Sequence, residues 1–314
     1  MRNRLLMLLS SLLLVLVAAG PADAIINGTP DGNDHPYVGQ LLFYVPDDVD
    51  PRFNDPGSWF NCSGTLLNDT IVLTAGHCTY GTGLNGESTT TTPTPGELVG
   101  SGGNDVWVNF SEVPDYSILP PSTKFAPGNN AGRYEAWSTA LNASPEWHRA
   151  TSNPHPDFDP NAFFLHDLGV LELDDGVHAG AGALPQAGLL DRLVKDRTQR
   201  YTAVGYGLEG SGQHTAIGGD TRRAAQMQLV NLNGVAGVGK GVAAKFSNNN
   251  GKTHTGGTCF GDSGGPIFRS GTNIIVAVTS FGISQTCKDG TGAYRVDQAD
   301  DLEFLATFGV RPRR

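Results

Sequence analysis

Residues 261–266 read Gly-Asp-Ser-Gly-Gly-Pro, and this hexapeptide is the sharpest chemical signal in the chain. A serine hydroxyl is a weak nucleophile, so a catalytic serine needs a neighbouring base and a rigid, exposed setting. Glycines on both sides allow a tight turn and let backbone N–H groups approach a substrate carbonyl. The pattern therefore indicates a nucleophile at Ser263, although an ordinary glycine-rich turn has a similar composition.

The same hexapeptide also fits the G-x-S-x-G motif of α/β-hydrolases, in which an acid and then a histidine follow the serine. The last histidine of this chain is His254, so no base follows Ser263. That motif also requires a helix directly after the serine, whereas Pro266 leads into a strand-like apolar run. An esterase of that class is therefore disfavoured, and the base must lie upstream.

Two upstream motifs supply a base and a carboxylate. His77 lies in the segment 73–78, Leu-Thr-Ala-Gly-His-Cys, and a histidine suits the role because its ordinary pKa of about 6.5 lies near working pH. Asp167 opens an apolar strand, where a carboxylate is costly to bury unless a donor such as a histidine Nδ1–H reaches it. His166 is the nearest alternative candidate for the base, but the sequence around it is better explained by a functional role for the adjacent Asp167.

Segments 74–78, 166–171 and 261–266 resemble the three catalytic motifs of trypsin- and chymotrypsin-like serine proteases, in that family's His, Asp, Ser order. The resemblance extends from Ile25 to about Phe308. It implies a serine endopeptidase with His77, Asp167 and Ser263 as its catalytic residues, acting on protein or peptide substrates without a metal or organic cofactor. The alternative is a non-catalytic homologue that keeps the fold as a binding or adhesion module.

The resemblance also implies the parts that surround the catalytic residues. The N–H groups of Gly261 and Ser263 are expected to form the oxyanion hole, and the free amine of Ile25 is expected to pair with Asp262. A glycine stands where trypsin-like enzymes carry a pocket aspartate, so we expect large apolar P1 residues such as Phe, Tyr or Leu. The expected substrate-binding residues are Gly257, Thr258, Ser280, Phe281, Gly282 and Gly292.

The first 24 residues predict a secretory signal peptide. A short positive region at Arg2 and Arg4 precedes an apolar run, and Ala22-Asp23-Ala24 offers small residues before a cleavage site. The apolar run, Leu5–Ala19, is shorter than the roughly 20 residues that span a bilayer. We therefore expect a secreted domain at 25–314, with no membrane partner, whose secretion exposes the amine of Ile25.

The net charge and the cysteine content limit which partners, disulfides and metal sites we expect for this chain. The formal net charge of −10 would repel a phosphate backbone, so we expect no nucleic-acid partner, and we expect a monomer. Four cysteines in a secreted chain suggest two disulfides with three possible connectivities, of which nearest-neighbour pairing (Cys62 with Cys78, Cys259 with Cys287) is preferred. No C-x-x-C pair occurs and the eight histidines are scattered, so no metal site is predicted.

The pattern of short apolar runs between turn residues favours an all-β sandwich or barrel. With the family resemblance, it predicts two perpendicular six-stranded antiparallel β-barrels and a C-terminal helix that Asp297 would cap. The first barrel is expected at about 25–175, a linker at about 176–200, and the second barrel with the helix at about 201–314. Residues 80–104 read as a polar surface loop. Strands are expected at 37–45, 64–75, 105–110, 168–173, 201–206, 225–232 and 274–281.

Overall fold

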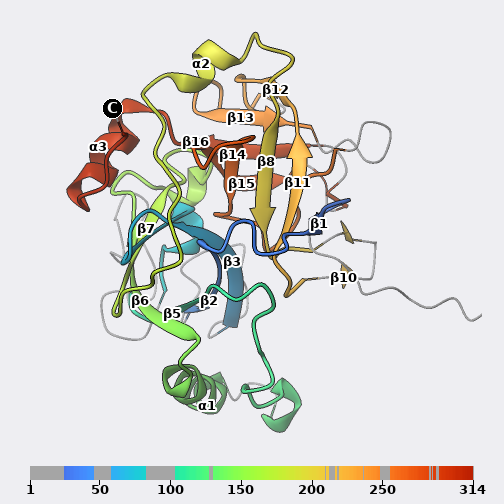
Figure 1. Cartoon of the computed structure of the whole chain (residues 1–314). Helices are drawn as coiled ribbons and strands as arrows, with labels where there is room; N and C mark the ends of the chain where they lie inside the picture. The colour runs from blue at the N-terminus through green and yellow to red at the C-terminus, as the bar shows by residue number, and fades with distance from the viewer. Residues whose placement is uncertain are drawn as a thin grey trace, which may run out of the picture.

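The computed structural model describes residues 25–45, 58–82, 103–126, 130–208, 210–211, 216–217, 219–235, 237–247, 255–282, 284, 286–287 and 290–313. The predicted signal peptide at 1–24 and most of the loop predicted at 80–104 lie outside these residues. Within the described part of the chain, no helix is both long enough and apolar enough to cross a membrane. Figure 1 shows two β-units, one above the other, with α3 beside them.

Six antiparallel strands close into the first barrel in the order β2-β3-β4-β7-β6-β5. The longest pairing runs from Val38 opposite Thr65 to Val45 opposite Ser58. Branched apolar side chains fill the barrel, and Leu41 is fully buried there. The strands are β2 Val38–Val45, β3 Ser58–Leu66, β4 Ile71–Thr74, β5 Val106–Asn109, β6 Trp147–Pro154 and β7 Gly169–Leu173.

The second unit is a half-barrel sheet of eight strands in the order β1-β11-β8-β14-β15-β16-β13-β12. The all-β fold class with two units is thus confirmed, although this unit has eight strands and two open edges where a closed six-stranded barrel was expected. The strands are β1 Thr29–Pro30, β8 Tyr201–Gly205, β11 Arg223–Met227, β12 Leu229–Asn231, β13 Ala243–Phe246, β14 Pro266–Arg269, β15 Ile275–Gly282 and β16 Thr291–Arg295. The short strands β9 Gly210–Ser211 and β10 Ala216–Ile217 form a separate pair.

The boundary between the two units differs in one respect from the expected division. Strand β1 falls inside the stretch expected for the first barrel, yet it pairs with β11 in the second sheet through Thr29 opposite Ala224. The stretch expected as a linker contains the short helix α2, Leu189–Leu193, and a bridge from Ala183 to Ile274. The N-terminal segment therefore belongs to the second unit in space.

The C-terminal helix was predicted and is present as α3, Ala299–Thr307. Its Leu302 and Leu305 are buried in the core. The predicted cap was wrong: Gln298 occupies the N-cap position without a side-chain bond, because the Asp297 carboxylate accepts from the N–H of Leu190 at 2.7 Å. Asp297 instead joins α3 to α2.

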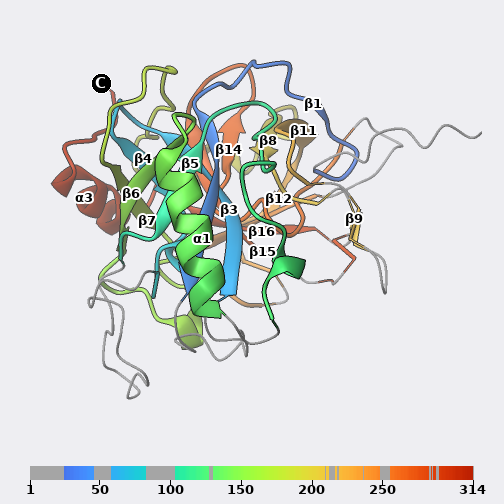
Figure 2. The same ribbon diagram turned by 90° about the horizontal axis from the view of Figure 1, so that it is seen from below.

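Helix α1, Asn130–Ala143, has no counterpart among the predicted elements. Its apolar residues do not form one stripe, so the sequence lacks the periodicity that indicates an amphipathic helix. Figure 2 shows α1 along the outside of the first barrel, beside β6. Indole hydrogen bonds fix it there: Trp137 donates to the carbonyl of Pro120, and Trp107 of β5 donates to Asn142, each at 2.8 Å.

One hydrophobic core joins the two units. It contains Leu73 and Val170 of the first barrel, Phe268 and Val278 of the second sheet, and Leu305 of α3, all of them almost completely buried. A close-packed core of this kind resists relative movement of the elements that it joins. Residues at the edge of the barrel are therefore held at fixed positions relative to residues at the edge of the sheet. A site shared between the two units requires such fixed positions.

Candidate active site

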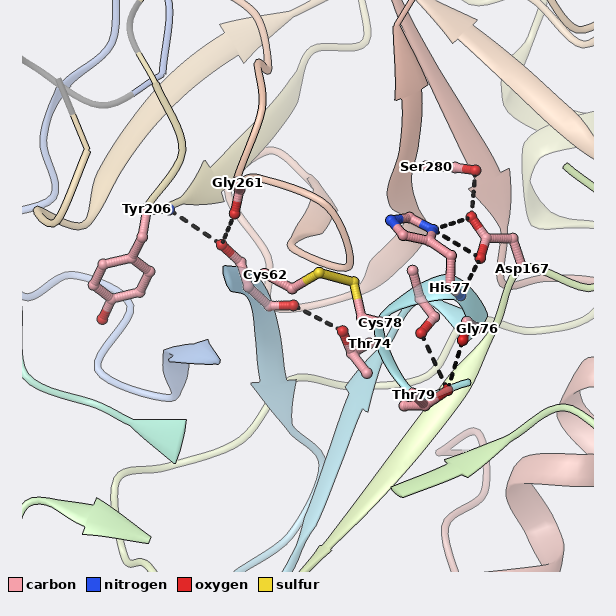
Figure 3. The surroundings of a disulfide bond; sticks show 12 residues. Cys62, Thr74, Gly76, His77, Cys78, Thr79, Asp167, Tyr206, Gly261 and Ser280 are labelled. Carbon is pink, nitrogen blue, oxygen red and sulfur yellow. Dashed lines mark hydrogen bonds and ion pairs between the residues drawn. A yellow bond between two sulfur atoms is a disulfide. The ribbon is translucent and has the colours of Figure 1, made fainter. Parts of the chain in front are cut away.

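His77 lies in a short 3₁₀ helix, Gly76–Cys78, directly after β4 (Figure 3). The disulfide from Cys78 to Cys62 ties this turn to β3, and it is one of the two nearest-neighbour pairs expected from the sequence. The hydroxyl of Thr79 donates to the carbonyl of Gly76 at 2.8 Å and closes the turn from the other side. The backbone that carries the imidazole is therefore fixed by a covalent bond and by a side-chain bond.

Asp167 is fully buried just before β7, and three donors compensate for the loss of water around its carboxylate. The ring Nδ1 of His77 lies 3.0 Å from both carboxylate oxygens, and the backbone N–H of His77 donates to Oδ1 at 2.9 Å. The hydroxyl of Ser280 donates to Oδ2 at 2.5 Å (Figure 3). This arrangement places the Nδ1 proton between His77 and Asp167, so the other ring nitrogen is left to accept a proton.

Ser263 lies in the turn before β14, packed against the first barrel. Its carbonyl accepts from the N–H of Ser63 in β3 at 2.7 Å. Gly264 has a φ of +75°, and a Cβ there would clash with the hydroxyl of Thr74 in β4. Only glycine fits this close approach, so the sequence of the turn itself brings Ser263 to the strand that leads to His77.

The backbone on the N-terminal side of Ser263 presents two N–H groups. Gly261 has a φ of +96°, which few residues other than glycine adopt. The neighbouring Asp262 N–H donates to the carbonyl of Cys259 at 3.1 Å, whereas the N–H groups of Gly261 and Ser263 donate to no acceptor within the described residues. Two such donors beside a nucleophilic serine could stabilise a developing oxyanion, which is the role expected of them from the sequence.

His77 and Ser263 line the same pocket, which has a volume of about 310 Å³. Within the described residues no direct hydrogen bond joins their side chains, and such bonds commonly shorten only when substrate binds. No carboxylate is found among the described lining residues. The lining consists of His77, Phe163, Thr258, Cys259, Phe260, Ser263, Thr279, Ser280, Phe281, Gly282, Ser284, Cys287 and Gly290.

The structure places the six expected substrate-binding residues in two groups. Four line the pocket, namely Thr258, Ser280, Phe281 and Gly282, while Gly257 and Gly292 are not among the described lining residues. Gly257 instead pairs with Ile26. Gly292 lies opposite Phe281 in the sheet, and the Phe281 ring packs so closely on it that a Cβ at 292 would clash. The ring thus fills the space that Gly292 was expected to open.

Three residues of the site were not predicted in these roles. The expected role of Ser280 in binding substrate backbone stays a prediction, and its hydroxyl has a second role that was not predicted, because it donates to Asp167. Ser63 supports the Ser263 turn twice, because its side chain also donates to the carbonyl of Gly261 at 3.0 Å. Phe163 lines the pocket and packs edge-on against Phe281 with ring centroids 5.8 Å apart. Each role depends on contacts between distant segments, for which the sequence carries no local signal.

The disulfide from Cys259 to Cys287 forms the second nearest-neighbour pair and lines the pocket. The expected partners Ile25 and Asp262 are both fully buried. The carboxylate of Asp262 accepts from the N–H of Gly207 and from the N–H of Cys259, both at 2.8 Å. The ion pair between the Ile25 amine and Asp262 remains a prediction.

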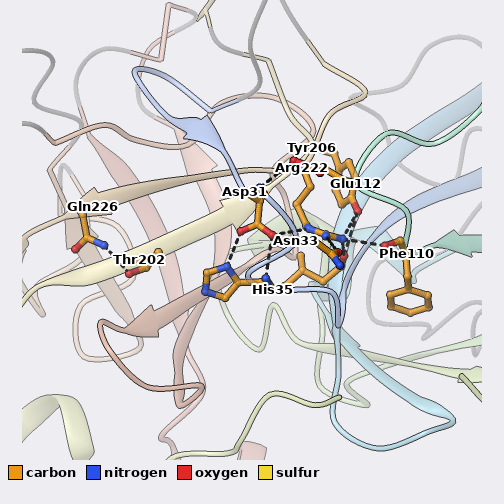
Figure 4. Close-up of polar contacts among 11 residues, drawn as sticks. Asp31, Asn33, His35, Phe110, Glu112, Thr202, Tyr206, Arg222 and Gln226 are labelled. Carbon is orange, nitrogen blue, oxygen red and sulfur yellow. Dashed lines mark hydrogen bonds and ion pairs between the residues drawn. The ribbon is translucent and has the colours of Figure 1, made fainter. Parts of the chain in front are cut away.

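A buried ionic network fixes the segment that leads from Ile25 to the first barrel (Figure 4). Asp31 and Arg222 have fully buried side chains, with Asp31 Oδ2 2.9 Å from Arg222 Nε. His35 places its Nδ1 2.6 Å from Asp31 Oδ1 and donates its backbone N–H to Oδ2. Burial opposes ionisation of Asp31, but these bonds outweigh it and lower its pKa. Asp31 is therefore charged at neutral pH.

Replacing Asp31 with asparagine is expected to lower stability by about 3–5 kcal/mol at pH 7, because it leaves the Arg222 charge buried without a carboxylate. The pKa of Asp31 is lower in the folded state than in the unfolded state, so its contribution is present above pH 4 and is lost as pH falls below that range. Denaturant unfolding of Asp31→Asn and parent at pH 7 and pH 3 should show a difference that narrows at pH 3. Asp196→Asn, at an exposed carboxylate, is the control; equal destabilisation by both would contradict the prediction.

The chain is similar in sequence and in fold to known proteins. Two proteins of Drosophila melanogaster, Serine protease 1 and Serine protease 2, are each 24% identical to the chain over 258 residues, covering 79% of the chain and 75% of the relative. The solved structure of HL collagenase superposes with a TM-score of 0.58 at 18% identity, covering 91% of this chain and all of that one. The structure of HBP gives 0.54 at 16% identity, covering 92% of this chain and all of that one.

A closed six-stranded barrel, a half-barrel sheet and a short C-terminal helix make up the fold of the trypsin-like serine proteases. The family model described as Trypsin matches residues 128–302, more than half of the chain. The chain belongs to the trypsin family.

Proposed function

We propose that this protein is a secreted serine endopeptidase that hydrolyses peptide bonds through His77, Asp167 and Ser263. The observation that carries the proposal is the hydrogen bond between the His77 ring and the buried Asp167 carboxylate, in the pocket that Ser263 also lines. A histidine oriented in this way is a base directed toward a nucleophile. The family's usual chemistry, and the secretion predicted from residues 1–24, are consistent with this role.

In the proposed reaction, Ser263 Oγ attacks the scissile carbonyl while His77 removes the hydroxyl proton. The carbonyl oxygen becomes an oxyanion, which the N–H groups of Gly261 and Ser263 stabilise. His77 then gives the proton to the leaving amine. In the second half, water attacks the acyl carbonyl while His77 removes its proton, and His77 returns that proton to Ser263 Oγ as the acid product leaves. Asp167 keeps the Nδ1 proton in place and stabilises the imidazolium without being protonated itself.

The pocket lining favours an apolar P1 side chain. A buried Lys or Arg would need a carboxylate partner, and the described lining residues supply none. Phe281, Phe163 and the Cys259–Cys287 disulfide instead give the pocket an apolar surface. Because the Phe281 ring covers Gly292, the pocket is less open than glycine walls alone would make it. We expect Phe, Tyr or Leu at P1.

A mixed peptide library incubated with the mature protein tests both reaction and specificity. Cuts after Phe, Tyr or Leu are expected, whereas cuts after Arg or Lys would keep the mechanism but overturn the pocket assignment. Gly282→Val is the variant that tests the pocket. A Cβ at 282 would make no close contact with the rest of the protein, and the valine side chain would occupy the pocket. It should reduce turnover of large P1 substrates at least tenfold, a typical effect of misfit in an apolar pocket, while leaving thermal unfolding unchanged. Unchanged turnover in this variant would mean that Gly282 is not a pocket wall.

Activity is further expected to need a free amine at Ile25. One extra residue, Ala24, would prevent that amine from pairing with the buried Asp262 carboxylate, and breaking a buried pair costs about 3–5 kcal/mol. Protein that retains Ala24 should therefore show kcat/KM lower by at least about 100-fold than protein that begins at Ile25. Ile25→Val, with its amine free, should stay within a few-fold. Equal activity with and without Ala24 would refute this activation step.

A further inference from the structure

Ser63 of β3 is a fully buried serine that contacts the Ser263 turn from the side of the first barrel. Its N–H donates to the carbonyl of Ser263 at 2.7 Å, and its hydroxyl donates to the carbonyl of Gly261 at 3.0 Å. Its own carbonyl accepts from the hydroxyl of Thr74 at 2.9 Å. Ser63 therefore holds two carbonyls of the turn, one on each side of Asp262.

A second partner sets the direction of the hydroxyl bond. The backbone N–H of Tyr206 donates to Ser63 Oγ at 3.1 Å. A serine hydroxyl has one proton to donate, and it accepts through its lone pairs. Because the Tyr206 N–H occupies a lone pair, the single proton is directed to the Gly261 carbonyl. Without the hydroxyl, a buried N–H and a carbonyl would both lose their partner, which is unfavourable.

The Gly261 carbonyl belongs to the peptide unit that separates the two expected oxyanion donors, the N–H groups of Gly261 and Ser263. A peptide unit is planar and trans, so a donor that holds its carbonyl also fixes the direction of its N–H. The Phe260 carbonyl, which shares a unit with the Gly261 N–H, accepts from the N–H of Leu208 at 2.7 Å. The next unit, between the two donors, is the one whose carbonyl Ser63 holds.

This separating unit follows the residue with the greatest backbone freedom in the turn. Gly261 has a φ of +96°, and a glycine restricts its own rotation less than any other residue does. The unit has two anchors: the Ser63 hydroxyl on its carbonyl, and the carbonyl of Cys259, which accepts from its Asp262 N–H at 3.1 Å. Loss of the hydroxyl would leave one anchor, and the angle between the two donors could then vary.

We propose that Ser63 is a positioning residue of the oxyanion hole, whose hydroxyl sets the relative direction of the N–H groups of Gly261 and Ser263. The inference rests on the proposed peptidase function and assigns to that site a residue outside the three catalytic ones. Donors of an oxyanion hole are effective because they already point to where the charge develops. Ser63 is not among the described residues that line the pocket, so it acts on the transition state through the backbone.

Ser63→Ala in the mature protein tests this role. Loss of one oxyanion-hole donor lowers the rate by about 10²–10³, so misdirected donors should lower kcat by at least about tenfold. KM should change little, because Ser63 does not contact the substrate. A peptide aldehyde with a large apolar P1 residue accepts Ser263 Oγ at its carbonyl carbon, and its oxygen then occupies the oxyanion position. Its inhibition constant should rise by the factor by which kcat falls, as expected of a transition-state analogue.

Ground-state binding is measured separately, with Ser263→Ala as the background. Protein that carries both Ser63→Ala and Ser263→Ala should bind an uncleaved peptide as tightly as protein with Ser263→Ala alone. A general distortion of the site would weaken the binding of peptide and aldehyde alike. A role in the oxyanion hole weakens the binding of the aldehyde alone, so the comparison separates positioning from a merely structural role.

Ser152→Ala is the matched control, because Ser152 is also fully buried in the first barrel and its hydroxyl accepts from that of Thr82 at 2.9 Å. It should keep the kcat and the aldehyde affinity of the parent. If thermal unfolding shows that Ser63→Ala does not fold, Ser63→Gly, which also lacks the hydroxyl, replaces it with the same expectation. A folded variant without the hydroxyl that keeps the parent's kcat, or loses kcat without binding the aldehyde more weakly, overturns the inference. A parent that cleaves no peptide would refute the proposed function, and this inference with it.

Discussion

Mature protein carrying Ser263→Ala is expected to lose peptidase turnover by roughly 10⁶, if the three catalytic residues act as one unit. The Ser263 turn is held by Ser63 of β3 and by the close contact of Gly264 with Thr74 of β4, and neither contact involves the Ser263 hydroxyl. The substitution should therefore remove the nucleophile without moving the turn. Substrate should still bind, because the pocket lining and the donors at 261 and 263 remain.

The measurement is kcat on a peptide with a large apolar P1 residue, together with the affinity of the variant for an uncleaved peptide. Ser122→Ala, at an exposed serine of the short helix Ser122–Lys124, is the matched control and should keep full turnover. Retained turnover in Ser263→Ala would mean that another group is the nucleophile. If neither parent nor variant cleaves while both bind peptide, the alternative of a non-catalytic binding homologue gains support.

The sequence predicted the parts of the site that are local in the chain. Each of the three motifs combines its proposed catalytic residue with small or apolar neighbours that shape its turn, as Gly264 does for Ser263. The order of the motifs also separated this fold from α/β-hydrolases. Seven apolar runs were predicted as strands, and all lie on strands of the structure. Two of these runs, however, cover parts of two strands: 64–75 spans the end of β3, a turn and β4, and 225–232 spans the end of β11 and all of β12.

What the sequence could not predict depends on contacts between distant segments. Ser280 bonds Asp167 across 113 residues, and Phe281 covers Gly292 only because a register shift in the β15–β16 pair sets them opposite each other. Asp297 looked like a helix cap, but the N–H of Leu190 provided a competing partner. Helix α1 has no periodic apolar stripe, and hydrogen bonds to distant segments hold it on the barrel instead.

Asp167→Asn is expected to lower kcat by about 10⁴, the magnitude known for this change in the Ser-His-Asp template of the family. Three donors converge on the carboxylate: the His77 N–H, the His77 Nδ1–H and the Ser280 hydroxyl. An asparagine offers one acceptor oxygen and an NH₂ group, so one donor must face another donor. His77 can relieve the conflict by carrying its proton on Nε2, and it then cannot accept the proton of Ser263.

The effect on individual rate constants separates this role from a structural one. Asp167 lies behind His77 and does not line the pocket, so KM should change little while kcat falls. Asp196→Asn, at an exposed carboxylate that also bonds backbone N–H, should alter neither constant. Because the substituted asparagine would still fill the same buried volume, thermal unfolding should show a folded protein. A folded Asp167→Asn variant with unchanged kcat would mean that the tautomer of His77 does not limit the reaction, and that Asp167 only holds the turn at His77.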